Sequence, residues 1–389
     1  MSSTSEVREI AFGRPWITDE ERAAVLGVLA GPILTHGPQG KAFETEFAAF
    51  AGANARAVTV SSCMAALHLA YLAADVGPGD EVLVPAQTHI ATAHAVEWVG
   101  ATPVFVDCDP ADGNVTAAAI ERAITPRTKA VAVVHFAGIP CDMPAICDVA
   151  SKRGLKVVED CALALGARYR GTHVGLFGDA GCFSFYPVKH ITTGEGGMFL
   201  TRHPDIAARV GRLRAFGVDR TFAERTIPGM YDVPTLGLNY RMSEMQAALG
   251  RVQLGRIGEI LSRRRRNFET LARGVRGIPL LTVVEPQDAL ASSSHYCLTV
   301  RIDAGKASLR NALVLRLNAA GVGTSVHYPQ PVPRMTYYRK KYGYDESRFP
   351  CAAGISDHTF ALPVAPHVTD DDIAYMNAAL SQAVSEVLG

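Results

Sequence analysis

From about residue 20 onward, short β-branched runs alternate with alanine- and leucine-rich stretches of helical periodicity. The helical stretches include 65–74, 117–123 and 144–153. Strands that alternate with helices predict a mostly parallel sheet covered by helices on both faces. We therefore expect an α/β fold around a seven-stranded sheet, with strands at Ala57–Val60, Glu81–Val84, Pro103–Asp107, Ala130–Val134, Leu155–Val158, Gly181–Phe185 and Met198–Leu200.

The pattern changes in the last third of the chain. One long helical segment covers 243–275, and antiparallel-looking strands at 296–302 and 323–327 then accompany helices at 308–320 and 369–387. This change predicts a large domain over residues 1–261, including the N-terminal segment, and a smaller C-terminal α+β domain over 262–389. A chain of 389 residues is long enough to bury two such cores.

Two of the expected strands lead into reactive side chains. Asp160 follows the run 155–158, and Lys189 lies between the aromatic run 182–186 and the glycine-rich turn 192–197. Ligands bind such sheets at the carboxyl ends of the strands. Most lysines are only surface charges, but a partly desolvated lysine loses proton affinity and presents the neutral amine that attacks an aldehyde. A Schiff-base lysine and an acid that protonates a pyridine nitrogen are what pyridoxal 5′-phosphate (PLP) chemistry requires.

An anion site is expected near these two groups. The segment Ser61–Met64 directly precedes the helical stretch 65–74, and a serine in such a place is often only a cap. The exposed N–H groups and the dipole of such a helix end also favour a phosphate. Ser184, in the strand that leads to Lys189, is a candidate hydroxyl donor to the same phosphate. His89 follows another strand and offers a flat ring, although nothing in its spacing singles it out.

Charge and composition exclude several other functions. The chain has 38 basic and 38 acidic side chains, so it lacks the basic excess that nucleic acid or an anionic membrane calls for. The run Arg263–Arg266 is interpreted as a solvated helix face.

The eight cysteines form no C-x-x-C pair and show no metal-ligand spacing. The N-terminus has no apolar core of a signal peptide, and the longest uncharged run, 82–96, is too polar to span a bilayer. We expect a cytoplasmic protein.

Over nearly its whole length the chain resembles the DegT/StrS-type aminotransferases, which are mostly nucleotide-sugar aminotransferases of PLP fold type I. The matching motifs occur in one order, which makes the resemblance specific. They are Gly31–Pro32, Thr35–Pro38, Gly77–Val82, Gly100–Asp107, Glu159–Asp160, Gly178–Asp179, Phe183–Phe185, Lys189, Thr192–Gly197, Leu238–Met242, Gly321, Val326–Tyr328 and Leu362–Pro363.

The resemblance implies a role for each matching residue. Lys189 is implied as the Schiff-base lysine and Asp160 as the partner of the pyridine nitrogen. His89 matches the ring-stacking position, and Asn239 matches an asparagine that reaches the phosphate of the neighbouring subunit, which implies a homodimer with shared active sites. The backbone of Cys63 and Met64 with the Ser184 hydroxyl matches the phosphate site, and Thr35, His327 and Tyr328 fall near the expected sugar site.

Three positions depart from the family pattern. Leu163 stands where the family usually has a glutamine or histidine that contacts the ring oxygen of the cofactor. Leu165 occupies another commonly polar position, and Met64 replaces the usual threonine of the phosphate site. The lysine, the acid and the anion site are retained.

The activity that the resemblance implies is a ping-pong transamination that moves an amino group from L-glutamate or L-glutamine to a keto sugar, which is expected to be linked to a nucleotide. The nearest alternative is a PLP-dependent sugar dehydratase of the same family, but that branch replaces the lysine with histidine and this chain has Lys189 followed by His190. An idle PLP-fold protein with a regulatory role would not need the intact lysine and aspartate. A nicotinamide-binding enzyme is disfavoured because no G-x-G-x-x-G follows the first strand.

Overall fold

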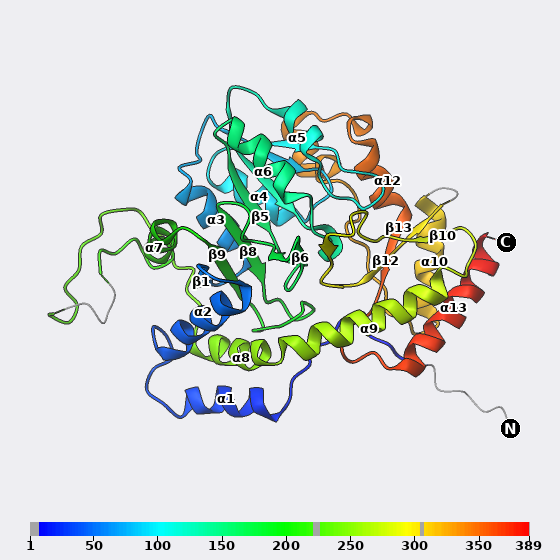
Figure 1. The fold of residues 1–389 in the computed structure, drawn as a ribbon, viewed down its shortest axis with the longest axis horizontal. Helices are drawn as coiled ribbons and strands as arrows, with labels where there is room; N and C mark the ends of the chain where they lie inside the picture. The colour runs from blue at the N-terminus through cyan, green and yellow to red at the C-terminus, as the bar shows by residue number, and fades with distance from the viewer. Residues whose placement is uncertain (1–7, 221–225, 304–306, 389) are drawn as a thin grey trace.

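A seven-stranded sheet lies at the centre of the molecule, which is described as a computed structural model over residues 8–220, 226–303 and 307–388 (Figure 1). The strand order is β1-β9-β8-β5-β4-β2-β3, and β9 alone runs antiparallel to its neighbours. The expected fold class is confirmed. The strands are β1 (Arg56–Val60), β2 (Glu81–Pro85), β3 (Thr102–Val106), β4 (Thr128–Val134), β5 (Lys156–Asp160), β8 (Ala180–Ser184) and β9 (Gly197–Thr201).

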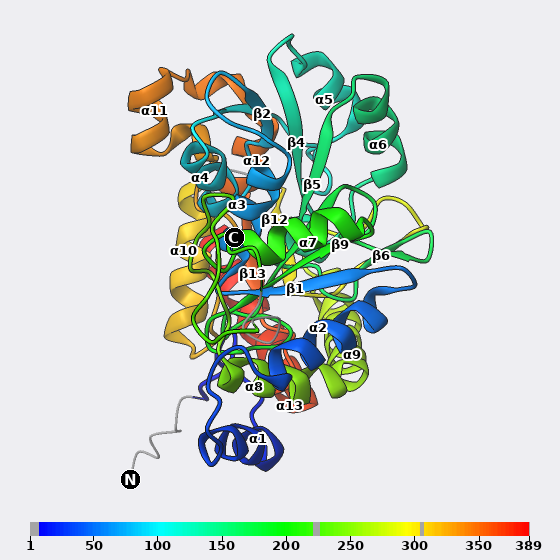
Figure 2. The same ribbon diagram turned by 90° about the vertical axis from the view of Figure 1, so that its left-hand side faces the viewer.

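Alternate side chains of each strand enter opposite layers, because successive residues of a strand point to opposite faces. Val82 and Val84 pack on the face covered by α3 (Cys63–Ala73), α4 (Ile90–Trp98) and α7 (Pro204–Leu213). Leu83, between them, packs on the other face. That second face is covered by α2 (Pro38–Ala51), α5 (Ala117–Ala123), α6 (Met143–Lys152) and α8 (Glu244–Gly255). Figure 2 shows α3 and α4 on one side of β4 and β5, with α5 and α6 on the other.

A second, antiparallel sheet has its own core towards the C-terminus. Its strands are β10 (Leu281–Val283), β12 (Leu298–Ile302) and β13 (Thr359–Leu362), in the order β10-β12-β13. Apolar side chains of α9 (Ile257–Val275), α10 (Ala307–Ala319) and α13 (Asp370–Leu388) fill this core. The predicted domain boundary after residue 261 falls inside α9, which runs continuously along both parts in Figure 1. The two-domain division therefore stays a prediction.

The remaining elements are short. A small sheet joins β11 (Ala291–Ser292), β6 (Arg168–Tyr169) and β7 (Thr172–His173). The other helices are α1 (Asp19–Leu29), α11 (Thr336–Tyr342) and α12 (Pro350–His358), with single turns of 3₁₀ helix at 136–138, 332–334 and 346–348. In the part of the chain that the structure describes, no helix combines the length and apolar character of a membrane span.

Two local predictions were wrong. The helix expected over 243–275 breaks at Arg256, where φ is −100° and ψ is 7°, and divides into α8 and α9. Gly255 precedes the break, and glycine disfavours helix interiors. The strand expected at 323–327 forms only an isolated bridge from Ser325 to Ala361, because the preceding residue Val322 pairs instead with Ile10 of the N-terminal segment.

The interpretation of the arginine run as a solvated face was wrong for one residue. Arg263 and Arg265 are ion-paired with acids one helical turn away and remain exposed. Arg264 is only 3% exposed. Its spacing from Ile260 and Phe268 places it on the buried face of α9, which four consecutive arginines conceal from a pattern-based prediction.

Candidate active site

The sheet register brings the proposed site residues to one edge. Val60, Gly197 and Ser184 lie side by side at the ends of β1, β9 and β8, and Asp160 ends β5 beside β8. Gly197 permits this packing, because a Cβ there would lie 2.7 Å from the Cys63 backbone nitrogen. The beginning of α3 is thereby held against the strand ends.

The beginning of α3 has the donors of an anion site. Ser62 caps the helix by accepting a hydrogen bond from the Ala65 N–H at 3.1 Å. The N–H groups of the first helical residues, Cys63 and Met64, have no partner within a helix, and the helix dipole adds positive potential there. The Ser184 hydroxyl has only a long contact, 3.4 Å from the Tyr186 N–H, so its proton is available to a ligand. This donor set fits a phosphate group.

Asp160 is a buried carboxylate, 5% exposed. The Thr92 hydroxyl donates to its Oδ2 at 2.8 Å, and the Ala162 N–H donates to its Oδ1 at 3.0 Å. None of the ion pairs among the described residues includes Asp160. A buried carboxylate without a cationic partner is costly, and this one fits the protonated ring nitrogen of PLP.

Lys189 lies in the turn after β8, half-buried. Its N–H donates to the Tyr186 carbonyl at 2.9 Å, and its Nζ lies 5.2 Å from the centre of the Tyr296 ring. Burial lowers the pKa of Lys189, while the nearby Cys63 and Asp160 act to raise it. The net effect favours the neutral amine, which is the nucleophilic form.

His89 begins α4 as its N-cap. Its Nδ1 accepts a hydrogen bond from the Ala91 N–H at 3.2 Å, and this contact orients the ring. Burial of the ring lowers the pKa of His89. The ring lies 5.9 Å from that of Tyr328, yet the residue as a whole stays exposed, so one face of a neutral imidazole is open to a ligand.

His327 and Tyr328 join the same cluster from the C-terminal part of the chain. The centre of the His327 ring lies 5.6 Å from that of Tyr296, and its buried Nδ1 has no hydrogen-bond partner among the described residues. Burial lowers the pKa of His327 to about 3, and the Lys189 charge contributes. Burial raises the pKa of Tyr328, and Asp160 adds to that shift.

The structure does not bring Thr35 or Asn239 into this cluster. Thr35 is exposed in the segment between α1 and α2, and the neighbouring Leu34 carbonyl accepts a hydrogen bond from the Glu244 N–H at 2.9 Å. Asn239 is exposed, and its backbone pairs with Ala215. In the described part of the chain neither side chain is hydrogen-bonded to the residues around Lys189.

The two leucines at commonly polar positions are part of the packing. Leu163 and Leu165 are each 4% exposed among apolar side chains. The Leu163 carbonyl accepts a hydrogen bond from the Ser294 hydroxyl at 2.7 Å. The main chain after Asp160 is therefore fixed by a serine from the C-terminal part, while the side chain offers no polar group to a ligand.

Glu159 precedes Asp160 in β5, and its side chain binds backbone groups on the opposite face of the strand. Its carboxylate accepts hydrogen bonds from the backbone N–H groups of Gly175, Phe177 and Gly178, at 2.7 to 2.9 Å, and lies 3.1 Å from His135 Nε2. Together with Cys161, these side chains place possible metal-ligand atoms within 4.8 Å of one another. Because both Glu159 oxygens already accept hydrogen bonds, the arrangement is structural.

Sequence reasoning missed two residues beside Lys189 and Asp160. Thr92 lies three residues after His89, so helical spacing alone places the two on one face of α4. The polar residues at the start of that helix were the one sequence signal that could have indicated Thr92 as a site residue. Tyr296 precedes β12, more than a hundred residues after Lys189, and no local pattern connects the two.

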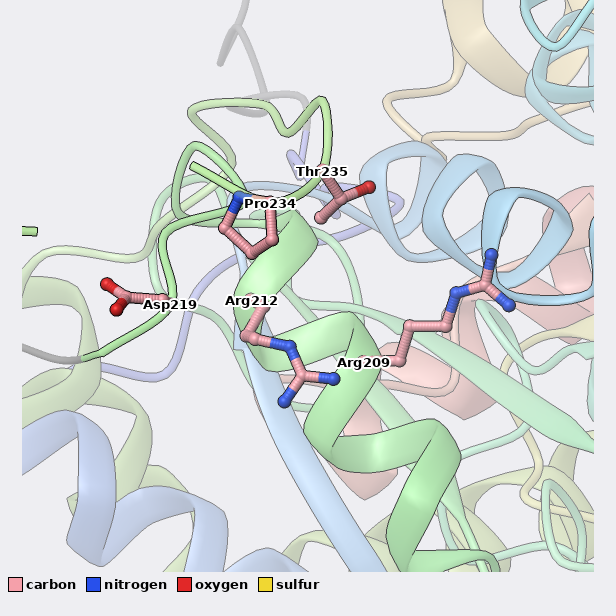
Figure 3. A pocket seen from close by; sticks show the side chains of 5 residues that line it. All are labelled: Arg209, Arg212, Asp219, Pro234 and Thr235. Atoms are coloured by element: carbon pink, nitrogen blue, oxygen red, sulfur yellow. The ribbon is translucent and has the colours of Figure 1, made fainter. Parts of the chain in front are cut away.

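Two surface hollows lie away from these residues. One of about 380 Å³ beside α7 is lined by Arg209, Arg212, Asp219, Pro234 and Thr235 (Figure 3). Arg209 extends away from Asp219 in this view and forms its ion pair with Asp75. Another, of about 650 Å³, lies between α2 and α8 beside the ion pair of Arg251 with Glu46. Neither hollow contains a predicted site residue.

Comparison with known proteins agrees with this chemistry. The chain is 39% identical over 372 residues to the spore coat polysaccharide biosynthesis protein SpsC of Bacillus subtilis, covering 94% of each chain. It resembles the solved aminotransferase TlmJ from Streptoalloteichus hindustanus with a TM-score of 0.89, at 34% identity, over 98% of this chain and 100% of that one.

A third relative was solved with its cofactor. The putative sugar aminotransferase Spr1654 from Streptococcus pneumoniae, in its pyridoxamine phosphate (PMP) form, matches with a TM-score of 0.92 at 29% identity, over 97% of this chain and 100% of that one. The same protein was also solved in a PLP form. The profile of the DegT/DnrJ/EryC1/StrS aminotransferase family matches residues 15–381. The chain therefore belongs to the DegT/DnrJ/EryC1/StrS family and is a PLP-dependent aminotransferase.

Proposed function

We propose that this aminotransferase moves an amino group from L-glutamate or L-glutamine to a keto sugar that is linked to a nucleotide. The observation that carries the chemistry is the Lys189 amine, whose pKa burial lowers, beside the buried carboxylate of Asp160. The sugar part rests on the relatives, among them SpsC of a spore coat polysaccharide pathway and PseC of Helicobacter pylori, an aminotransferase of pseudoaminic acid biosynthesis.

The residues divide the work between proton transfer and binding. Bound PLP supplies an electron sink for the negative charge that develops at the donor carbon. With PLP bound, the Lys189 amine would act as the general base that takes the proton from the Cα of the donor and holds it for transfer within the site. Asp160 keeps the ring nitrogen protonated, and the hydrogen bonds from Thr92 and Ala162 keep its carboxylate in place. The same groups act in reverse on the keto sugar.

The binding roles are proposed from the contacts of the site residues. The N–H groups of Cys63 and Met64 and the Ser184 hydroxyl would hold the phosphate, and His89 would lie against the ring. His327 and Tyr328 are proposed to face the sugar, because both belong to the cluster around Lys189. Thr35 is proposed to reach the sugar from the exposed segment between α1 and α2.

Asn239 is proposed to complete the phosphate site of a neighbouring subunit, so that a homodimer is the active form. Its exposure, away from the Lys189 cluster of its own chain, supports this role. The described residues before it include five large apolar side chains that are at least half exposed, and a second copy of the chain would cover them. They are Ile227, Met230, Tyr231, Val233 and Leu236.

The first test separates proton transfer from binding. PLP-loaded wild-type enzyme is mixed with L-glutamate or L-glutamine, and conversion to the PMP form is followed by absorbance together with keto-acid release. We expect conversion by the wild type and none by Lys189→Ala or Lys189→Arg, with circular dichroism spectra that match the wild type. Normal turnover by either variant would end the proposed role of Lys189.

The products distinguish the alternatives for the acceptor step. Ammonia release without an amino product would identify the dehydratase. One structural relative is 3-amino-5-hydroxybenzoic acid synthase, with a TM-score of 0.88 at 30% identity, whose name specifies a carbocyclic product. Acceptors tested should therefore include a keto-cyclitol. Amination of the cyclitol alone would replace the keto sugar in the proposal and leave the chemistry of Lys189 unchanged.

A further inference from the structure

Arg264 is a buried cation without an acidic partner. It lies in the middle of α9 with 3% exposure, and burial lowers its pKa to about 10. Within the described ranges, none of the ion pairs includes Arg264, whereas Arg263, Arg265 and Arg266 each pair with a carboxylate. A buried charge is costly to maintain, and even buried ion pairs can often be replaced by apolar residues of similar volume without loss of stability. Stability alone therefore does not account for an arginine here.

The guanidinium contacts two main-chain carbonyls, one in the turn that carries Lys189 and one in the segment 294–296. Nη1 donates to the Tyr296 carbonyl at 2.8 Å, and Nη2 lies 3.5 Å from the Lys189 carbonyl. The second contact is long and weak by itself. A second hydrogen bond joins the same two segments, because the next residue, His190, donates through its Nε2 to the Ser294 carbonyl at 3.0 Å. The turn that carries Lys189 is thus tied twice to the segment 294–296.

The same segment also reaches the turn after Asp160. The Ser294 hydroxyl donates to the Leu163 carbonyl at 2.7 Å. The Tyr296 ring lies 5.2 Å from the Lys189 amine. A shift of this segment would therefore move the ring that shields the lysine and loosen the lysine turn at the same time.

We propose that Arg264 is a positioning residue, which holds the backbone carbonyls of Lys189 and Tyr296 so that the lysine amine stays desolvated against the tyrosine ring. The proposal rests on the proposed catalytic role of Lys189. Arg264 does not touch the reacting atoms and acts through these two residues. Its planar fork presents several donors in fixed directions, which a lysine or a methionine cannot reproduce.

The test measures the lysine amine directly, without cofactor or substrate. Apo enzyme is labelled with acetic anhydride across a range of pH, and modification of the Lys189 peptide is quantified by mass spectrometry to give the pKa of the amine. In Arg264→Met we expect this pKa to rise towards that of an ordinary lysine by one unit or more, because water reaches the amine. Arg264→Lys keeps a charge without the fork, and we expect it to behave like Arg264→Met.

Kinetics of the loaded enzyme give a second readout. We expect kcat of both Arg264 variants to fall about tenfold or more, with the donor KM within about threefold of the wild type. The matched control is Arg263→Met, one position away on the exposed face of α9. This variant should change neither the pKa of Lys189 nor kcat. Thermal unfolding is measured for all variants, and Arg264→Lys carries the test if Arg264→Met does not fold.

An unchanged Lys189 pKa and a kcat within twofold of the wild type in a folded Arg264 variant would overturn the proposal and leave Arg264 a purely structural residue. This outcome is distinct from failure of the proposed function. If Lys189 is not the catalytic base, Lys189→Ala keeps its turnover whatever the labelling of Arg264 variants shows.

Discussion

At the scale of single residues, the site depends on how Asp160 is held. Its carboxylate is buried and accepts hydrogen bonds from Thr92 and from the Ala162 backbone. Thr92 in turn is 2.7 Å from the Thr88 hydroxyl, and both threonines are fully buried. A chain of two hydroxyls therefore fixes the carboxylate that is proposed to face the ring nitrogen.

Removal of one hydroxyl from this chain should weaken the enzyme without unfolding it. A hydrogen bond to a charged group contributes about 1.5–3 kcal/mol, so we expect Thr92→Val to lower kcat/KM by about ten- to a hundredfold. Thr92→Ser keeps the hydroxyl and should stay within about threefold of the wild type. The rate at which L-glutamate or L-glutamine converts the PLP-loaded enzyme to the PMP form gives kcat/KM of the donor half-reaction for both variants, and equal values for Thr92→Val and Thr92→Ser would show that the Thr92 hydroxyl does not support Asp160.

Which site residues are predictable from sequence depends on how local their signal is. Lys189 and Asp160 could be proposed from the sequence because each stands near the end of an expected strand. Thr92 and Tyr296 were missed, because their roles depend on contacts across elements that no spacing shows. Arg264 was misjudged because its three arginine neighbours are exposed, and only the buried periodicity of α9 distinguishes it.

At the scale of elements, the beginning of α3 packs against β9 and is also the proposed phosphate site. Gly197 of β9 lies against this helix end, where a Cβ would come within 2.5 Å of the Ser62 carbonyl carbon. Because that obstacle is backbone, the helix end must shift to accept any side chain. A glycine on a neighbouring strand therefore sets the position of the proposed anion site.

Gly197→Ala should displace the anion site. We expect the affinity for PLP, measured by fluorescence titration of the apo enzyme, to fall about tenfold or more. Gly211→Ala in α7 is the control, because a Cβ there meets nothing within 4 Å and alanine favours helix. Unchanged PLP affinity in Gly197→Ala would mean that α3 does not hold the phosphate.

A buried acid joins α1 to α8. Glu21 is 1% exposed and accepts hydrogen bonds from the Thr18 N–H at 2.6 Å and from Gln253 Nε2 at 2.7 Å, and it is also paired with Arg256. Burial acts to raise the pKa of Glu21, but these contacts outweigh it and lower the pKa to about 2. The carboxylate is therefore more stable in the folded chain than in the unfolded one.

This shift predicts a pH-dependent contribution to stability. A carboxylate whose folded pKa lies below its unfolded value stabilises the fold above the unfolded pKa of about 4.5 and loses this effect as the pH falls towards 2. A shift of this size corresponds to about 3 kcal/mol. We expect Glu21→Gln to be less stable than the wild type by about that amount at pH 7, with a gap that narrows below pH 4.5. Urea unfolding at several pH values measures the gap, and a constant gap would contradict the assignment.

At the scale of the whole molecule, sequence patterns predicted the sheet better than the C-terminal part. The seven strands were expected because each is a short apolar run between helices of clear periodicity. The short strands β10 and β13 were missed because their pairing with β12 depends on contacts between separate segments of the chain, and the short helices α11 and α12 were not predicted either. The bridges from Val322 to Ile10 and from Ser325 to Ala361 replaced the strand expected at 323–327 for the same reason.

The proposed dimer makes its own prediction. Asn239→Ala removes a side chain that is exposed in its own subunit, so the fold and the dimer mass from light scattering should be unchanged while PLP affinity falls about tenfold. Ser347→Ala, at an exposed position in the turn 346–348, is a control that should alter neither quantity. A wild-type enzyme that is active as a monomer would exclude the shared site.

The central claim, transfer of an amino group to a keto sugar, is tested most directly by a single turnover. Wild-type enzyme loaded with PMP is mixed in turn with UDP-, GDP-, CDP- and dTDP-linked keto sugars and with free keto sugars, and both the absorbance of the PLP form and the mass of the product are followed. The account predicts that at least one nucleotide-linked keto sugar restores the PLP form and yields the matching amino sugar, and that Lys189→Ala yields none. Failure of every keto sugar with an enzyme that L-glutamate or L-glutamine converts to the PMP form would contradict it.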